Sequence, residues 1–177
     1  MATQTRNPTS DISATGTWTG TAGSRYTLVD DYPSTDTADQ LTHGNTAGNI
    51  RFGFTAFSVP AGATDIVVRI YHYDREATSG NNNFGSQLII EGAQYITPSG
   101  LHLPTTTTTL RTATYTTNPR LGTAWTVNQV NGSGANSIQA FGLVSTDANP
   151  QISVTSIQIE VEYTEPTGDT SAMFLLF

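Results

Sequence analysis

Three groups of side chains in this sequence have types that could carry chemistry: clustered aspartates, three histidines and a set of aromatic residues. The aspartates Asp30, Asp31, Asp36 and Asp39 lie close together, and hard cations such as Ca²⁺ take several oxygen ligands from one loop. Their spacing lacks the alternating Asp/Asn pattern and the closing Glu of a calcium-binding loop. We keep these four as weak metal candidates, beside the alternative of a solvated loop whose carboxylates bond nearby backbone amides. No bound metal or other cofactor is expected.

The histidines His43, His72 and His102 lie far apart in sequence, and none forms an i, i+4 pair with another. We expect His72, which stands between Tyr71 and Tyr73, to be a packed or interface imidazole, with a metal-binding or catalytic role as the lesser alternative. The chain has no Gly-x-Ser-x-Gly segment, no cysteine thiol and no lysine for a phosphate-binding loop. We predict that the protein is not an enzyme.

The aromatic residues suggest a further site. Trp18, Trp125 and the seven tyrosines could form a platform for stacking sugar rings, although aromatic residues of a β-sandwich more often belong to the core. Glu160 and Glu162 stand one strand period apart, and we interpret them as carboxylates on a solvated face rather than as a glycosidase acid and base.

The C-terminal segment is the most informative, because it places five large apolar side chains after a polar linker: Met173, Phe174, Leu175, Leu176 and Phe177. Burying one Leu or Phe gains about 1.5–3 kcal/mol, and five of them left in water would make an adhesive end. The segment either folds back onto its own domain or docks on a neighbouring subunit, as an added strand or in a groove. We favour docking, which makes these five the predicted partner-binding residues.

Composition excludes several partners. A net charge of −7 and a pI near 4.6 oppose binding to nucleic acid. No run of about 18 apolar residues is present, so no membrane helix is expected. Residues 1–10 lack a basic region followed by an apolar stretch, and we expect synthesis in a cytoplasm without a secretion signal.

The elements that must position these residues are predicted to be strands. Period-two alternation is clearest in residues 151–163, where Ile157, Ile159, Val161 and Tyr163 alternate with polar side chains. One short helix is predicted over Thr123–Val130, with Thr123 as its N-cap. Further strands are predicted at 65–76, 50–58, 24–30, 84–91, 110–117 and 138–145, with shorter ones at 15–20 and 93–97.

These strands, separated by turn residues, predict an all-β fold: a two-sheet antiparallel β-sandwich, jelly-roll-like, with about eight or nine strands. Residues 1–14 are polar without an apolar pattern and are predicted to form an extended N-terminal arm. The sandwich domain is expected over 15–163, followed by a C-terminal arm, 164–177, that contains the linker and the apolar tail.

Three segments resemble a known family. These are Asn7–Ser13 with the following Gly16-Thr17-Trp18, the segment Tyr115–Thr126, and the closing strand Val154–Tyr163. In order and spacing over about residues 7–163 they are similar to β-sandwich domains of tailed bacteriophage structural proteins, found in head decoration proteins and fibres. The resemblance implies a virion component without catalytic residues. The apolar tail after Tyr163 lies outside the pattern.

Two functions follow from these observations. The first is a viral structural protein that decorates or cements a capsid, stabilising the shell because it binds only the assembled state. This hypothesis implies a homo-oligomer, taken as a trimer, a major capsid protein or other virion protein as partner, and a location in the virion after synthesis in the host cytoplasm. The alternative is a phage fibre or host-recognition module that binds surface glycan, and it predicts an exposed aromatic platform.

Overall fold

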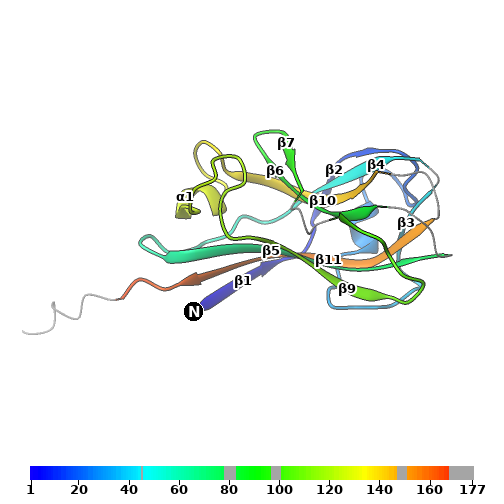
Figure 1. The fold of residues 1–177 in the computed structure, drawn as a ribbon, viewed down its shortest axis with the longest axis horizontal. Helices are drawn as coiled ribbons and strands as arrows, with labels where there is room; N and C mark the ends of the chain where they lie inside the picture. The colour runs from blue at the N-terminus through cyan, green and yellow to red at the C-terminus, as the bar shows by residue number, and fades with distance from the viewer. Residues whose placement is uncertain (45, 78–82, 97–100, 147–150, 168–177) are drawn as a thin grey trace, which may run out of the picture.

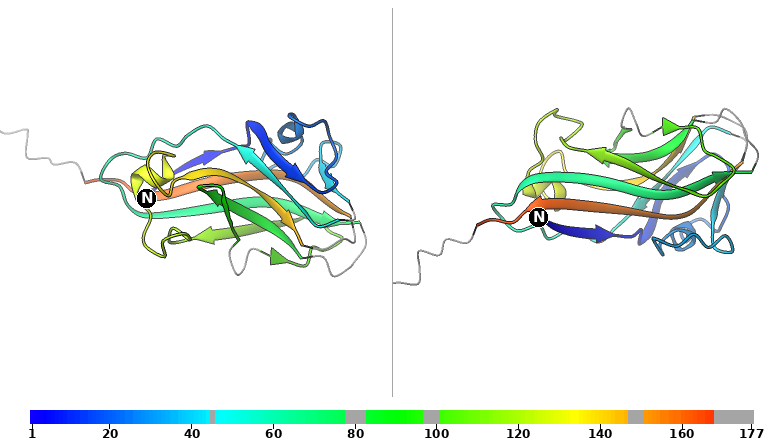
Figure 2. Two further views of the ribbon diagram at one scale, coloured as in Figure 1. Left: turned by 90° about the horizontal axis from the view of Figure 1, so that it is seen from above. Right: turned by 60° about the horizontal axis from the view of Figure 1, so that its bottom comes forward.

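The computed structural model describes residues 1–44, 46–77, 83–96, 101–146 and 151–167. Two sheets pack face to face, and every strand pairing within them is antiparallel (Figures 1 and 2). The first sheet has the order β1 (Ala2–Arg6), β11 (Ile152–Thr164), β5 (Thr64–Glu76) and β9 (Thr109–Tyr115), with β3 (Leu41–His43) also on β11. The second has the order β2 (Ser10–Thr15), β4 (Gly48–Gly53), β10 (Ile138–Ser145), β6 (Phe84–Ile90) and β7 (Ala93–Tyr95), with β8 (Leu101–His102) on β6. The predicted all-β antiparallel sandwich is confirmed, with eleven strands in the described ranges instead of eight or nine.

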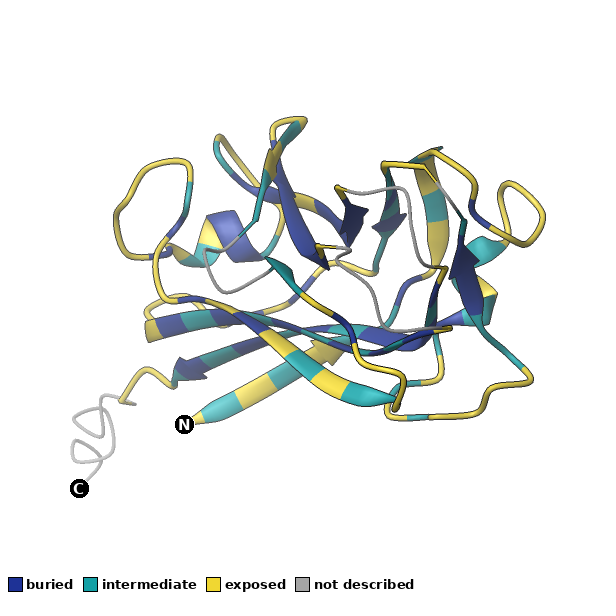
Figure 3. Cartoon of the chain, turned by 45° about the vertical axis from the view of Figure 1, so that its right-hand side comes forward, coloured by how far each residue is buried: buried dark blue, intermediate teal, exposed yellow. Residues whose placement is uncertain are grey.

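The two longest strands, β5 and β11, form the centre of the first sheet. Each has 13 residues, and they pair along almost their whole length. The alternation predicted for β11 is present, because Ile157, Ile159 and Val161 are fully buried. They pack into one core with the buried side chains of the second sheet, among them Phe52 and Phe141, whose ring centroids lie 6.3 Å apart. Buried residues lie along the strands and exposed ones gather in the loops (Figure 3).

The inner face of β5 changes character along the strand. Its buried residues, in chain order, are Ile66, Val68, Ile70, His72, Asp74 and Glu76. The first half is therefore ordinary apolar core, whereas the second half places titratable groups between the sheets. A buried charge is costly unless it is paired and hydrogen-bonded, so the second half needs specific partners.

The first 14 residues differ from the predicted arm, because they form two strands in two different sheets. β1 pairs with β11, and β2 pairs with β4. Besides its backbone pairing with β11, polar side chains hold β1: Gln4 Nε2 donates to the Tyr163 hydroxyl at 3.3 Å, and the Arg6 guanidinium lies 5.0 Å from the centre of the Phe57 ring. An edge strand held in this way carries no apolar period in its sequence, which is why the sequence pattern did not reveal it.

Residues 24–30, predicted as a strand, contain instead a short 3₁₀ helix, η1 (Arg25–Leu28). One carboxylate organises its start. Asp11 accepts hydrogen bonds of 2.8–2.9 Å from the backbone N–H groups of Gly23, Arg25 and Tyr26. These donors would be unsatisfied at the start of a helix, so a distant residue decides the local structure.

The predicted short helix is present, but it begins later than expected. It is α1 (Val127–Val130), and its N-cap is Thr126 rather than Thr123. The reason is a reciprocal capping box: Gln129 Oε1 accepts from the Thr126 N–H, and the Gln129 N–H donates to Thr126 Oγ1.

The loop before α1 is held together by its polar residues. Buried Asn118 donates from its backbone N–H to the Thr123 carbonyl at 2.8 Å, and its side chain bonds the backbone of Arg120 and Asn136. Trp125 Nε1 donates to the Tyr115 carbonyl at 3.0 Å. These residues therefore serve the fold.

The predicted partner-binding residues Met173–Phe177 lie outside the described residues. In the ranges that the structure describes, no helix has the length and hydropathy needed to cross a membrane.

Candidate functional site

Tyr32, Tyr71 and Tyr73 form an aromatic cluster on the outer face of the first sheet, here named the tyrosine face. Tyr71 and Tyr73 point away from the core because they alternate with the buried His72 on β5. Tyr32 belongs to the loop after η1, and its ring centroid lies 5.9 Å from both of the others at tilts of 35° and 33°. All three are half-buried, so each ring keeps part of its surface in solvent.

Three charged residues lie beside these rings. Arg69 Nη1 donates to Glu162 Oε2 at 2.6 Å and to Glu160 Oε1 at 3.2 Å, and the Tyr71 hydroxyl donates to the same Glu160 oxygen at 2.9 Å. The two glutamates were predicted to stand on a solvated face, yet their side chains are only 17% and 20% exposed. Burial and the bond to Glu160 raise the pKa of Tyr71 to about 12, so its hydroxyl stays a proton donor at neutral pH.

The tyrosine face continues onto the edge strand β9. Tyr71 pairs with Thr112 and Tyr73 with Leu110, and both of these β9 residues are exposed. The surface thus places aromatic rings, an aliphatic side chain and hydroxyl and carboxylate groups next to each other. The two tryptophans do not take part, because Trp18 and Trp125 are buried in the core.

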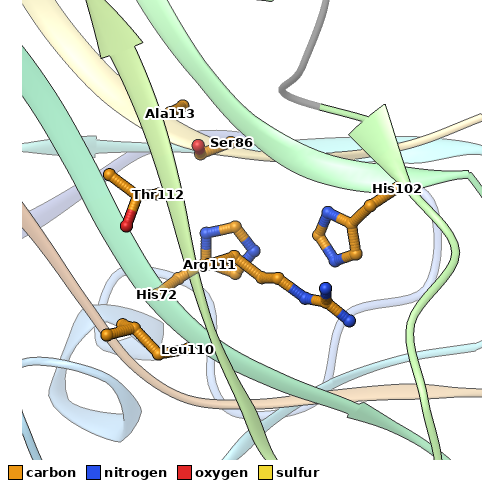
Figure 4. Close-up of a pocket in the computed structure, with 7 residues that line it drawn as sticks. All are labelled: His72, Ser86, His102, Leu110, Arg111, Thr112 and Ala113. Carbon is orange, nitrogen blue, oxygen red and sulfur yellow. The ribbon is translucent and has the colours of Figure 1, made fainter.

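A second site is a pocket of about 230 Å³ between the sheets, near the edge strand β9 (Figure 4). It is lined by His72 from β5, Ser86 from β6, His102 from β8 and residues 110–113 from β9. The two imidazole rings have centroids 5.7 Å apart, and the Arg111 side chain extends beside them (Figure 4).

Asp74 is the centre of a hydrogen-bond network beside this pocket. The carboxylate is fully buried, and its Oδ2 accepts from His72 Nε2 at 3.2 Å and from His102 Nε2. Its Oδ1 lies 3.4 Å from Arg111 Nε. Burial by itself would raise the pKa of Asp74, but the bonds from His102 and His72 outweigh burial and hold that pKa well below its ordinary value.

His72 contributes to the network as a neutral group. Burial lowers the pKa of His72, and the neighbouring carboxylate only partly offsets this shift. The contact between His72 and Asp74 is therefore a hydrogen bond to an anion rather than an ion pair at neutral pH. A neutral imidazole and an ionised carboxylate are also the forms in which these side chains bind transition metals.

The serine, histidine and aspartate side chains at the pocket are not arranged as nucleophile, base and acid of a serine hydrolase. His72 and Asp74 are in contact, but the buried Ser86 Oγ makes no hydrogen bond within the described part of the chain. A serine nucleophile needs a hydrogen bond to the base that takes its proton.

The four aspartates named as weak metal candidates do not form a ligand set in the structure. Asp36 Oδ1 accepts from the backbone N–H of Ala38 at 2.8 Å, as expected for the solvated-loop alternative. Burial, with the like charges of Asp31 and Asp39, raises the pKa of Asp30. The one group of three ligand-type side chains that the structure brings together in its described ranges is His72, Asp74 and His102.

The sequence contained part of the evidence for the group of His72, Asp74 and His102. His72 and Asp74 stand two residues apart in the predicted strand 65–76, which places both on one face. Nothing in the sequence indicates that His102 joins them, because it lies 28 residues after Asp74 in a strand of two residues. The third histidine, His43, lies elsewhere and stacks on Trp18 with ring centroids 4.3 Å apart.

Comparison with known proteins adds two similar structures. No family model and no curated protein matches the sequence. The C-terminal CBM6 of LamC, a marine laminarinase from Zobellia galactanivorans, aligns with 89% of this chain and 98% of its own at 15% identity and a TM-score of 0.46. The CBM22-1 xylan-binding domain of Xyn10C from Paenibacillus barcinonensis aligns with 90% of this chain and 86% of its own at 12% identity and a TM-score of 0.46. The ligands named in these descriptions belong to those two proteins.

Proposed function

We propose that this protein is a non-catalytic binding module of a bacteriophage fibre or host-recognition apparatus, and that it binds surface glycan through the tyrosine face. The observation that carries the proposal is the cluster of Tyr32, Tyr71 and Tyr73 next to Glu160 and its neighbours. The rings of these three tyrosines are half-buried and keep part of their surface in solvent, which supports the proposal.

The chemistry of the tyrosine face suits a sugar. A pyranose ring has an apolar face of C–H groups, which packs on an aromatic ring, and a rim of hydroxyl groups, which bond carboxylates and guanidinium groups. Sites for small ligands combine in this way an apolar surface with a few placed polar groups. Since Arg69, Glu160 and Glu162 already hold each other, they are pre-organised and lose little freedom on binding.

We expect Tyr32→Ala to weaken glycan binding about tenfold, the scale of one lost aromatic contact. The measurement begins with an array of bacterial surface polysaccharides and continues with calorimetric titration of the oligosaccharide that binds best. Tyr32 is suited to this test because it lies in a loop, and its removal leaves the strand pairing of β5 intact.

Two control variants make the test specific. Tyr32→Phe keeps the ring and should retain most of the affinity. Ile12→Ala removes an apolar side chain that is 54% exposed on the second sheet, and it should bind like the unchanged protein. Equal affinity of Tyr32→Ala and the unchanged protein, or an array without any bound glycan, would contradict the proposal.

A second candidate function is decoration of a phage capsid, which the apolar residues Met173–Phe177 of the sequence favour. In this proposal the tail docks on a neighbouring subunit or on the major capsid protein, and the protein is a homo-oligomer, taken as a trimer, in the virion. The two functions use different residues, so one does not exclude the other.

Deleting residues 170–177 tests this second function. We expect the truncated protein to lose most of its occupancy on purified particles, because burial of the five apolar side chains would supply the attachment energy. Occupancy is measured by quantitative gel analysis after particle purification, and mass photometry reports the oligomeric state. Unchanged occupancy and an unchanged oligomer would overturn the docking role of the tail.

A further inference from the structure

Two histidines and one aspartate converge beside the pocket between the sheets. His72 and Asp74 come from the polar half of β5, and His102 comes from β8 on the opposite sheet. Both Nε2 atoms are directed to the same carboxylate oxygen, and the three ligand-type atoms all lie within 4.8 Å of one another. We propose that His72, Asp74 and His102 form a binding site for a divalent transition metal ion, and that Zn²⁺ is the ion that the site prefers.

The donor set agrees with this ion. Zn²⁺ binds imidazole nitrogen and carboxylate oxygen at about 2.0–2.2 Å, and two ligands of a tetrahedron around it stand roughly 3.3 Å apart. The distance of 3.2 Å between His72 Nε2 and Asp74 Oδ2 matches one edge of such a tetrahedron. Two nitrogens with a single carboxylate disfavour Ca²⁺ and Mg²⁺, which take mainly oxygen ligands.

The surroundings of the three ligands also suit a metal. Arg111 Nε approaches Asp74 Oδ1, whereas both histidines contact Oδ2, and Arg111 so helps to fix the orientation of the carboxylate. Outer groups of this kind orient metal ligands in many proteins. Arg111 also places one positive charge near the ion. This charge favours an anion or hydroxide at any coordination position that has no protein ligand.

An independent observation points to such a further ligand in the pocket. Ser86 Oγ is fully buried and lines the pocket without a hydrogen-bond partner in the described ranges, and the buried Arg111 Nη2 also lacks one. Buried polar groups are almost always satisfied, so these two donors call for an acceptor inside the pocket. Water or an anion on a metal held by the three ligands would supply one.

The same contacts have a metal-free explanation, in which Asp74 simply accepts from two histidines and one arginine. A direct binding measurement separates the two. Untagged protein is stripped with EDTA, dialysed, and titrated calorimetrically with ZnCl₂, with MgCl₂ as the comparison ion. We expect one Zn²⁺ per chain, no measurable Mg²⁺ binding, and a higher melting temperature with Zn²⁺, since an ion that binds only the folded chain stabilises it.

Variants locate the bound ion. His102→Gln should weaken Zn²⁺ binding by more than the 10–100-fold expected for loss of an outer group, because it removes a direct ligand. The matched control is His43→Gln, which removes a buried histidine outside the pocket and should leave Zn²⁺ affinity unchanged. Circular dichroism of both variants serves as the check that they are folded.

Co²⁺ provides a spectroscopic readout that does not depend on stability. Bound in a site with imidazole ligands, it should give visible absorption bands that His102→Gln loses and His43→Gln keeps. The proposal is overturned if the unchanged protein binds no Zn²⁺, or if His102→Gln binds it as tightly as the unchanged protein. Either result leaves the glycan-binding proposal untouched, because the tyrosine face lies on the outer side of the sheet.

Discussion

Replacing Asp74 by asparagine is expected to lower the free energy of unfolding by about 1.5–3 kcal/mol, the scale of hydrogen bonds to a charged group, measured in EDTA so that no metal contributes. The carboxylate is fully buried and accepts hydrogen bonds from two imidazoles and a guanidinium. Asn keeps the shape but loses the charge, and its amide group points a donor at groups that are themselves donors. Because folded domains are stable by only about 5–15 kcal/mol, such a loss removes a large part of the total.

Urea unfolding followed by tryptophan fluorescence measures the effect. Trp18 and Trp125 are both buried and report on loss of the core. The control is Asp31→Asn, which makes the same chemical change at an exposed position in a loop. A loss below about 1 kcal/mol for Asp74→Asn, the size typical of a surface pair, would show that the network contributes little to stability.

Lowering the pH from 7 to 5 is expected to destabilise the metal-free protein. Burial lowers the pKa of His43 from its ordinary 6.5, against a smaller opposing effect of the hydrogen bonds to Thr46 and Thr17. The unfolded chain therefore takes up a proton near pH 6.5, whereas the folded chain does so only at lower pH. The stability from the neutral imidazole is complete above pH 6.5 and is lost as the pH falls towards the folded pKa, at up to about 1.4 kcal/mol per pH unit.

The variant His43→Gln isolates this contribution. Glutamine does not titrate and has an amide that can donate where His43 Nε2 contacts the Thr46 carbonyl. The variant is expected to be less stable at pH 7 but to lose stability less steeply between pH 7 and 5. Burial also lowers the pKa of His72, and this residue accounts for the dependence of stability on pH that remains in the variant. Equal slopes for the variant and the unchanged protein, in urea titrations at a series of pH values, would contradict the assignment to His43.

The central strands could be predicted from sequence because each carries its own signal. The apolar set Ile157, Ile159 and Val161 repeats at period two, and the mostly apolar run 66–73 is typical of a central strand or of one whose outer face meets a partner. The edge strands and η1 could not be predicted in this way. β1 is held by polar contacts of Gln4 and Arg6, and η1 depends on Asp11, so their conformation follows from distant partners rather than from their own residues.

The tyrosine face likewise combines residues whose placement follows from local alternation with residues whose placement depends on distant partners. Tyr71 and Tyr73 share one face of β5 because they stand two residues apart, but the sequence does not reveal that Tyr32 joins them. Glu160 and Glu162, alternating with apolar residues, were predicted to be solvated. Arg69 on the neighbouring strand instead pairs with both, and no pattern within either strand reports the register between two strands.

The sequence by itself determined the fold class, the central strands and the acidic, weakly charged surface, because these follow from composition and from periods of a few residues. Only the tertiary structure decided which side chains meet. His72 and Asp74 share a face for local reasons, but His102 reaches them only because β8 pairs with β6 in the opposite sheet. A site of this kind depends on how two sheets stack, and the free energy of that stacking is distributed over the whole core rather than encoded beside any one of its residues.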